Sequence, residues 1–187
     1  GNCCHELARQ QATNVIIDLP HKCDTNAVRQ LCVAALCNMS CCDKAWQQLS
    51  ESALGLILEG MSSPALPLDC RYNAVKTLAN LVCYFPKSRK SLVEAGAVTA
   101  LGNVLKQLKD EDQKYTVSKV LCEMSEYKEG HLGLLNDGAM NILVRLSKSE
   151  MADIKLNVAH ALSNISRCKF RTSIVEDGVI EALFWLS

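Results

Sequence analysis

Leu36-Cys37-Asn38-Met39-Ser40 is the stretch that decides the fold, because the chain repeats it at a nearly constant interval. The later copies are Leu78-Ala79-Asn80-Leu81, Leu121-Cys122-Glu123-Met124-Ser125 and Leu162-Ser163-Asn164-Ile165-Ser166. The Asn position recurs after 42, 43 and 41 residues. A period of this length indicates one supersecondary unit stacked on copies of itself. A single unit cannot bury its apolar face alone, so neighbouring units share one core, and we expect an extended binding surface instead of a catalytic pocket.

A second signal recurs in register with this phrase. Its copies are Glu94-Ala95-Gly96-Ala97-Val98, Asn136-Asp137-Gly138-Ala139-Met140 and Glu176-Asp177-Gly178-Val179-Ile180. Each glycine follows a short apolar stretch and precedes a longer one, where a positive φ lets the backbone turn sharply. Each unit is therefore predicted to be a short helix, a glycine turn, a longer helix, a loop and a third helix that carries the Asn phrase.

Apolar spacing indicates that the elements are helices. Val98, Leu101, Val104, Leu105 and Leu108 recur at intervals of three and four, which places them on one helical stripe. No stretch of strict apolar/polar alternation competes with this pattern. The four prolines are predicted to mark loops or first turns of helices, because proline in a helix interior costs about 3 kcal/mol. They are Pro20, Pro64, Pro67 and Pro86.

Composition excludes several classes of function. The chain has 187 residues, 49% of them apolar, and its 20 basic and 20 acidic residues cancel. Global charge therefore gives no reason to expect a nucleic acid or a membrane surface as the partner. No apolar run approaches the roughly 18 residues that span a bilayer. The 11 cysteines fall largely in the helical phrases. We therefore expect reduced core thiols in an intracellular protein of the cytoplasm, the nucleus or both.

The two motifs in register resemble the armadillo repeat. That family has three helices per unit, with a Gly-Ala/Val turn after the first and Leu-x-Asn-hydrophobic near the end of the third. The resemblance covers the whole chain and implies an all-α, right-handed α-solenoid (superhelix) of about four and a half repeats. The array is predicted to form a single domain, with repeats at 1–40 (partial), 41–84, 85–126, 127–167 and 168–187 (partial). The first two copies lack the turn glycine and carry Gln11 and Ser52 near that position.

The resemblance implies a concave groove lined by the third helices, in which the Asn side chains hydrogen-bond an extended peptide. Residues four apart share a helix face, so three rows are expected to line this groove. An amide can donate and accept at once, which suits a peptide backbone. The alternative, that these Asn side chains brace the helix ends internally, stays open. The candidate peptide-binding residues are Asn38, Tyr72, Lys76, Asn80, Tyr115, Lys119, Glu123, His160 and Asn164.

The residues four before the Asn row indicate which peptide fits. Nuclear-import adaptors of the family carry Trp in that row, whereas this chain has Ala34, Lys76, Lys119 and His160. Two lysines would repel a basic import signal, so that function is disfavoured. An acidic or phosphorylated peptide is expected instead, with Arg29, Arg71, Lys114 and Lys155 as candidates to extend the basic patch. The function predicted is a non-enzymatic protein-binding scaffold or adaptor. A regulatory or structural module of a larger enzyme or assembly is the alternative.

Three other patterns are weaker. Gly1, Cys3 and Cys4 resemble a dual acylation signal, but His5 stands where Ser or Thr is expected, and the double cysteine recurs at Cys41-Cys42. No membrane partner is therefore expected unless Gly1, Cys3 and Cys4 are acylated. Cysteines 37, 41 and 42 lack the paired spacing of a zinc site, so neither metal nor cofactor is predicted. His160 has no Ser or Cys partner at a readable spacing, so no catalytic residue is assigned.

Overall fold

The computed structural model describes Glu6, residues 12–167 and residues 178–186. Helices form this part of the chain, and no strand occurs among the described residues. The chain divides into two compact units, Gly1–Ala95 and Gly96–Ser187. The turn at Gln11, the acylation pattern at Gly1, Cys3 and Cys4, and the first helix of the fifth repeat lie outside the described residues.

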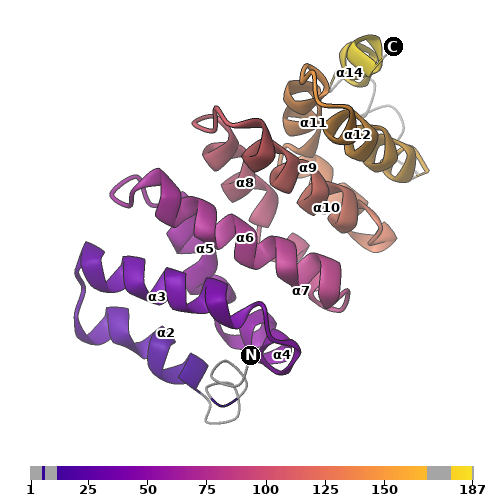
Figure 1. Ribbon diagram of the computed structural model, residues 1–187. Coiled ribbons are helices and arrows are strands. Elements are labelled where there is room, and N and C mark those ends of the chain that lie inside the picture. Colours follow the sequence, from indigo (N-terminus) through magenta and orange to yellow (C-terminus); the bar gives the residue numbers. More distant parts are fainter. Residues whose placement is uncertain (1–5, 7–11, 168–177, 187) are drawn as a thin grey trace. The chain divides into compact units, whose positions relative to one another are not determined.

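The first unit contains α2 to α7 (Figure 1). The third helices of its two repeats, α3 (Asn26–Met39) and α6 (Leu68–Tyr84), pack against each other. Helix α2 (Ala12–Lys22) packs on α3, and α5 (Leu54–Ser62) packs on both third helices. Helix α4 (Asp43–Ser52) contacts α2, α5, α6 and α7 (Ser88–Glu94). Two helical layers thus share one core, as the repeat pattern predicts.

The second unit repeats this arrangement with α8 to α14. Its third helices, α9 (Glu111–Ser125) and α12 (Ala152–Ile165), pack along each other. Its second helices are α8 (Ala97–Leu105), α11 (Ala139–Ser147) and α14 (Val179–Leu186), and α11 contacts the other two. A short 3-10 turn (Lys128–Gly130) leads into α10 (His131–Asn136), which packs on α11.

The turn glycines adopt the backbone conformation that the sequence predicts. Gly96 has φ 72°, Gly138 φ 86° and Gly178 φ 97°, and each directly precedes a second helix. Residues with a Cβ rarely adopt these φ values, which explains why glycine occupies these positions. The second repeat makes its turn without one, because Ala53 joins α4 to α5 at φ −95°. The prediction of a short helix, a turn, a second helix and a third helix is confirmed for the described copies.

The prolines follow their predicted positions with one exception. Pro64 and Pro86 lie in connections, and Pro67 is the cap that precedes α6. Pro20, however, lies inside α2, in its last turn, and is buried. The expectation that it marks a loop or first turn is wrong. The helix ends two residues later, at Lys22, so the missing N–H of Pro20 removes little of the helix's hydrogen bonding.

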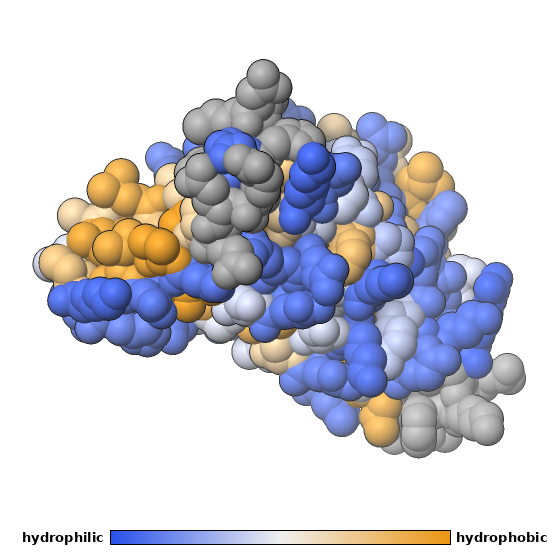
Figure 2. Space-filling view, turned by 90° about the horizontal axis from the view of Figure 1, so that it is seen from below, coloured by the Kyte–Doolittle hydropathy of each residue, from blue (hydrophilic) through white to orange (hydrophobic). Residues whose placement is uncertain are grey.

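The core is built from aliphatic side chains on the predicted stripes. Val98, Leu101, Val104, Leu105 and Leu108 are all buried. Cysteines contribute at Cys32, Cys42 and Cys70, and the eight cysteines of the described part are free thiols. Apolar side chains remain exposed on α2 and α3, among them Val15, Leu19 and Leu31. Figure 2 shows an apolar area on the side of the molecule where α2 and α3 lie in Figure 1.

Candidate functional site: the third-helix face

Within each unit, the Asn of one third helix is fixed by a serine of the preceding third helix. In the first unit, Asn80 Nδ2 donates to Ser40 Oγ at 2.8 Å. In the second unit, Asn164 Nδ2 donates to Ser125 Oγ at 3.0 Å. The same relation recurs seven residues earlier, where Asn157 Nδ2 donates to Ser118 Oγ at 2.9 Å. The internal bracing that the sequence left open as an alternative therefore exists at these positions.

The orientation of these amides follows from the serine hydroxyls. Ser40 Oγ donates its hydrogen to the Cys37 carbonyl at 2.6 Å, and Ser125 Oγ donates to the Cys122 carbonyl at 2.6 Å. Each hydroxyl has only one hydrogen, so toward Asn it acts only as an acceptor. The amide must therefore direct Nδ2 to the serine. Its Oδ1, an acceptor, is then directed away from that serine.

The serine carbonyls take part in the same junctions. Trp46 Nε1 donates to the Ser40 carbonyl at 2.8 Å, and His131 Nε2 lies 2.7 Å from the Ser125 carbonyl. Both ring nitrogens belong to the residue six positions after the serine. A carbonyl only accepts, so His131 Nε2 is the donor in this contact. Each described Ser junction thus joins the third helix of one repeat to the first helix of the next.

Lys76 and Tyr72 form the basic and aromatic part of the face in the first unit. Lys76 is exposed, and its Nζ lies 5.5 Å from the centroid of the half-buried Tyr72 ring. Lys76 also lies near the half-buried Cys37. Burial raises the pKa of the Cys37 thiol, while the Lys76 charge and the Thr77 hydroxyl act in the opposite direction. The predicted Lys-Tyr pair is therefore brought together, and Lys76 has no carboxylate partner among the described residues.

In the second unit the predicted residues lie on α9 and α12. Tyr115, Lys119 and Glu123 follow one another at intervals of four along α9 and are half-buried. On α12, His160 is exposed and Asn164 is half-buried. Asn38, the remaining predicted residue, is exposed on α3. The structure places each predicted residue on a third helix, and peptide binding by them stays a prediction.

The expected extension of the basic patch is wrong for Arg29, Arg71 and Lys114, whereas Lys155 is half-buried on α12 and is not contradicted. Arg71 is only 4% exposed, and its Nε donates to the Met61 carbonyl at 2.8 Å, so it is an internal brace. Arg29 is neutralised by Asp24 at 2.8 Å and Glu59 at 3.1 Å. The residues precede the Asn row by nine positions, which is not a whole number of helical turns, and this offset rotates them away from the Asn face.

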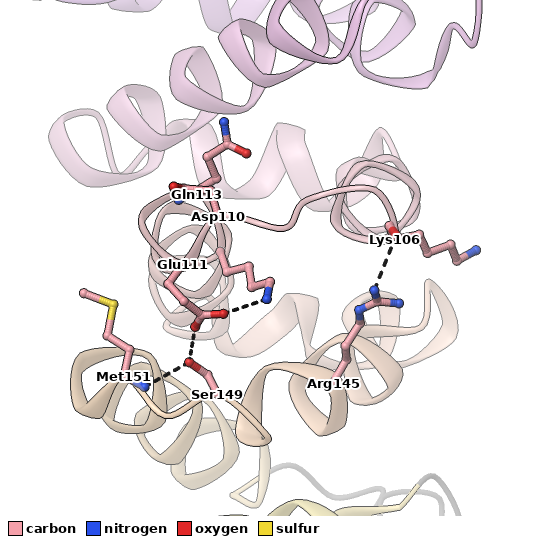
Figure 3. Close-up of polar contacts among 8 residues, drawn as sticks. Lys106, Asp110, Glu111, Gln113, Arg145, Ser149 and Met151 are labelled. Carbon is pink, nitrogen blue, oxygen red and sulfur yellow. Dashed lines mark hydrogen bonds and ion pairs between the residues drawn. The ribbon is translucent and has the colours of Figure 1, made fainter.

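A further polar junction in the second unit contains Lys114, another member of that row (Figure 3). Glu111 accepts hydrogen bonds from Lys114 Nζ at 2.6 Å and from Ser149 Oγ, and Ser149 Oγ accepts one from the backbone N–H of Met151 at 3.1 Å. These hydrogen bonds from Lys114 and Ser149 lower the pKa of the Glu111 carboxyl. The junction ties the start of α9 to the loop before α12, and it neutralises Lys114.

Sequence reasoning missed the serines of the junctions. Ser40, Ser125 and Ser166 recur two residues after the Asn position, and this signal was available in the repeated phrase. Ser40 and Ser125 are fully buried, whereas Ser166 is exposed. Val82 replaces the serine in the second repeat. Nothing in the spacing alone distinguishes a buried acceptor from a solvated hydroxyl.

Among the residues that the structure describes, no group of three or more His, Cys, Asp or Glu side chains is placed to hold a metal ion. In the same part of the chain, no helix has both the length and the apolar character needed to cross a membrane.

Comparison with known proteins supports the repeat architecture. No family model matches the chain. A curated protein of Aspergillus oryzae, Vacuolar protein 8, is 30% identical over 99 residues, which cover 52% of this chain but only 17% of that protein.

Two crystal structures of engineered proteins resemble the fold. The first has a TM-score of 0.74 and 21% identity and covers 98% of this chain and 76% of its own. The second has a TM-score of 0.71 and 19% identity and covers 92% of this chain and 70% of its own. Sequence identities this low support a similarity of fold and no conclusion about function. The chain is therefore an all-α protein of the helical-repeat class.

Proposed function

We propose that this chain is a protein-binding scaffold of the armadillo type, not an enzyme, and that the third helices of each unit hold an extended acidic peptide. The observation that carries the proposal is the orientation of Asn80 and Asn164. Each directs its Nδ2 to a serine, which leaves the carbonyl Oδ1 as the group that a ligand meets. An extended peptide supplies backbone N–H donors at regular intervals, and these match such acceptors.

Charge supports an acidic ligand. Lys76 and Lys119 stand one helical turn before the Asn row, and neither has a carboxylate partner within the described residues. Tyr72 and Tyr115 precede them by a further turn and offer rings against which ligand side chains pack. The second unit also carries a negative side chain, Glu123, in the Asn row. In this proposal Glu123 selects against an acidic residue at that one point of the peptide.

The proposal is tested with peptides selected from a random library of about 15 residues displayed on phage. We expect the selected sequences to be enriched in Asp and Glu. Fluorescence anisotropy then compares the unaltered protein with the double variant Lys76→Glu/Lys119→Glu, which should bind the peptides about tenfold or more weakly. Lys87→Glu/Lys109→Glu is the matched control, because both lysines are exposed and lie outside the third helices. If the two double variants bind the selected peptides with equal affinity, the proposal is wrong.

A module within a larger protein is the second candidate function. The curated relative is matched over only 17% of its length. In such a protein the third-helix face would pack against another domain instead of a separate peptide. This candidate predicts that the selected peptides compete with a flanking domain for Lys76 and Lys119, whereas the scaffold proposal predicts no such competition.

A further inference from the structure

The row of residues on α6 continues one helical turn beyond Asn80 and ends at Tyr84. Tyr72, Lys76, Asn80 and Tyr84 follow one another at intervals of four, all within α6. Residues spaced in this way lie next to one another on one side of a helix. Tyr84 is 61% exposed, so the row ends in a large accessible ring. The third-helix face of the first unit therefore extends past its Asn to an aromatic residue.

Trp46 holds the Tyr84 ring in place. The two rings are stacked, with centroids 5.7 Å apart and planes inclined at 11°. Trp46 is half-buried, and its Nε1 donates to the Ser40 carbonyl at 2.8 Å. Since one face of the Tyr84 ring lies against Trp46, the accessible surface of Tyr84 lies on the opposite face and the ring edge. The stacked pair is thus an aromatic platform whose orientation is set before a ligand arrives, which lowers the entropic cost of binding.

Exposure distinguishes Tyr84 from the other tyrosines. The chain has four tyrosines, and the structure describes all of them. Tyr84 is exposed, whereas Tyr72, Tyr115 and Tyr127 are half-buried. Tyr127 follows Glu123 by four residues and is therefore the counterpart of Tyr84 in the second unit. Accessible aromatic side chains are enriched at protein interfaces, so Tyr84 is a candidate contact for a partner.

Lys76 determines which charge the ligand carries beside the platform. It has no carboxylate partner among the described residues, and its Nζ lies over the Tyr72 ring. Lys76 and Tyr84 are eight residues apart within one continuous helix, so the rise of 1.5 Å per residue separates them by about 12 Å along α6. Four steps of an extended chain cover about 13 Å. One extended segment can therefore place an acidic residue at Lys76 and another side chain on the platform.

The side chain that suits the platform is aromatic. A flat ring stacks on the open face of Tyr84 as Trp46 stacks on the other face. A Lys or Arg side chain is also attracted to ring faces, but the positive charge of Lys76 on the same helix disfavours a second cation in the ligand.

We propose that the third-helix face of the first unit recognises a peptide in which an acidic and an aromatic residue stand four positions apart. The carboxylate meets Lys76, the peptide backbone donates to Asn80 Oδ1, and the aromatic ring stacks on Tyr84. Both orders, acidic–x–x–x–aromatic and aromatic–x–x–x–acidic, satisfy this geometry, because a peptide can run along α6 in either direction. This inference rests on the function proposed above and adds the aromatic requirement to it.

The test sorts the same phage-displayed random library against the unaltered protein and against Tyr84→Ala. With the unaltered protein, we expect Phe, Tyr and Trp to be enriched about fivefold at four positions from an Asp or Glu. With Tyr84→Ala this aromatic enrichment should disappear, while the enrichment in Asp and Glu remains because both groove lysines are unchanged. Tyr84→Phe keeps the ring and should keep the aromatic preference. Tyr127→Ala, which removes the counterpart in the second unit, is the matched control and should also keep it.

Affinities then connect the peptide ring to Tyr84. Fluorescence anisotropy compares one selected peptide with the same peptide carrying Ala at its aromatic position. This replacement should weaken binding to the unaltered protein about tenfold and binding to Tyr84→Ala less than about twofold. A ring that serves only the stability of the fold would leave the two ratios equal. Thermal melts check that each variant is folded.

Lys76→Glu provides a second readout that leaves the platform intact. Peptides selected against this variant should keep the aromatic residue, and the residue four positions from it should change from acidic to basic. This exchange is measured even if Tyr84→Ala does not fold. An acidic residue retained at that position contradicts the proposed pairing with Lys76.

The outcomes separate this inference from the function on which it rests. Selected peptides that are acidic but lack an aromatic residue at this spacing overturn the inference and leave the proposed function standing. The same holds for Lys or Arg enriched in place of the aromatic residue, and for an aromatic preference that persists in Tyr84→Ala. A selection without any enrichment in Asp and Glu overturns the proposed function, and the inference with it.

Discussion

Ser125→Ala is the substitution that examines the junctions between repeats most closely. Ser125 is fully buried, and its hydroxyl donates to the Cys122 carbonyl and accepts from Asn164 Nδ2. A net hydrogen bond contributes about 1 kcal/mol, so the loss of two costs about 2 kcal/mol. Asn164 is half-buried and can recruit water, which reduces the expected loss to about 1–2 kcal/mol.

Ser147→Ala is the matched control for this substitution. Ser147 is equally buried and donates to the Val144 carbonyl at 2.8 Å, but its hydroxyl has no partner in a neighbouring third helix. Its replacement should cost about 1 kcal/mol. Urea denaturation should therefore show Ser125→Ala to be the less stable variant by up to about 1 kcal/mol. In a chain of this length, each kcal/mol lowers the melting temperature by about 2–4 °C.

A double-mutant cycle isolates the hydrogen bond between Ser125 and Asn164, which belong to adjacent repeats. Combining Ser125→Ala with Asn164→Ala should give a coupling free energy of about 1 kcal/mol, because the second change removes a bond that the first has already broken. The cycle of Ser147→Ala with Asn164→Ala should couple by less than about 0.5 kcal/mol. Equal coupling in the two cycles would refute the reasoning that the Ser–Asn pair holds adjacent repeats together.

Three further predictions concern single positions. Gly138→Ala, at φ 86°, should destabilise the fold by about 1–2 kcal/mol, whereas Gly55→Ala, in a helix with open space around it, should stabilise it by up to about 1 kcal/mol in thermal melts. Because the folded pKa of Glu111 is lowered from the ordinary 4.5, its stabilisation is present above that pH and is lost as pH falls through the lowered pKa; Glu111→Gln should flatten this acid limb when urea midpoints are followed from about pH 6 to about pH 3. Iodoacetamide followed by mass spectrometry should alkylate the exposed Cys41 before Cys37, since Cys37 is half-buried and burial raises its thiol pKa.

The helices could be predicted because their signals are local. The turn glycines supply a positive φ, and the apolar residues of α8 lie on one face of the helix. Both requirements produce residues that recur at regular intervals in the sequence. The position of Pro20 was predicted wrongly because a local rule was applied without knowledge of where the helix ends. The rule against proline in helices concerns the interior, and the sequence does not show that α2 ends only two residues later.

The candidate site was predicted only in outline. The Asn and Lys rows follow from helical spacing alone, and the structure places them on third helices. The direction in which the Asn80 and Asn164 amides point depends on Ser40 and Ser125, roughly one repeat away. It also depends on the hydrogen bonds that these serine hydroxyls donate to carbonyls of their own helices. Burial of Arg71 is likewise a result of packing against the Met61 carbonyl. Contacts between residues of different repeats impose no pattern within either repeat, so they could not be predicted from the spacing of residues in the sequence.

The most direct test of the central claim is to map the binding surface by NMR, using a library-selected acidic peptide and ¹⁵N-labelled protein. The claim predicts shifts of the Asn80 and Asn164 side-chain amides and of backbone signals along α6, α9 and α12, all of them weakened in Lys76→Glu/Lys119→Glu. Shifts confined to α8 and α11, or a bound peptide that leaves the third helices unperturbed, would contradict it.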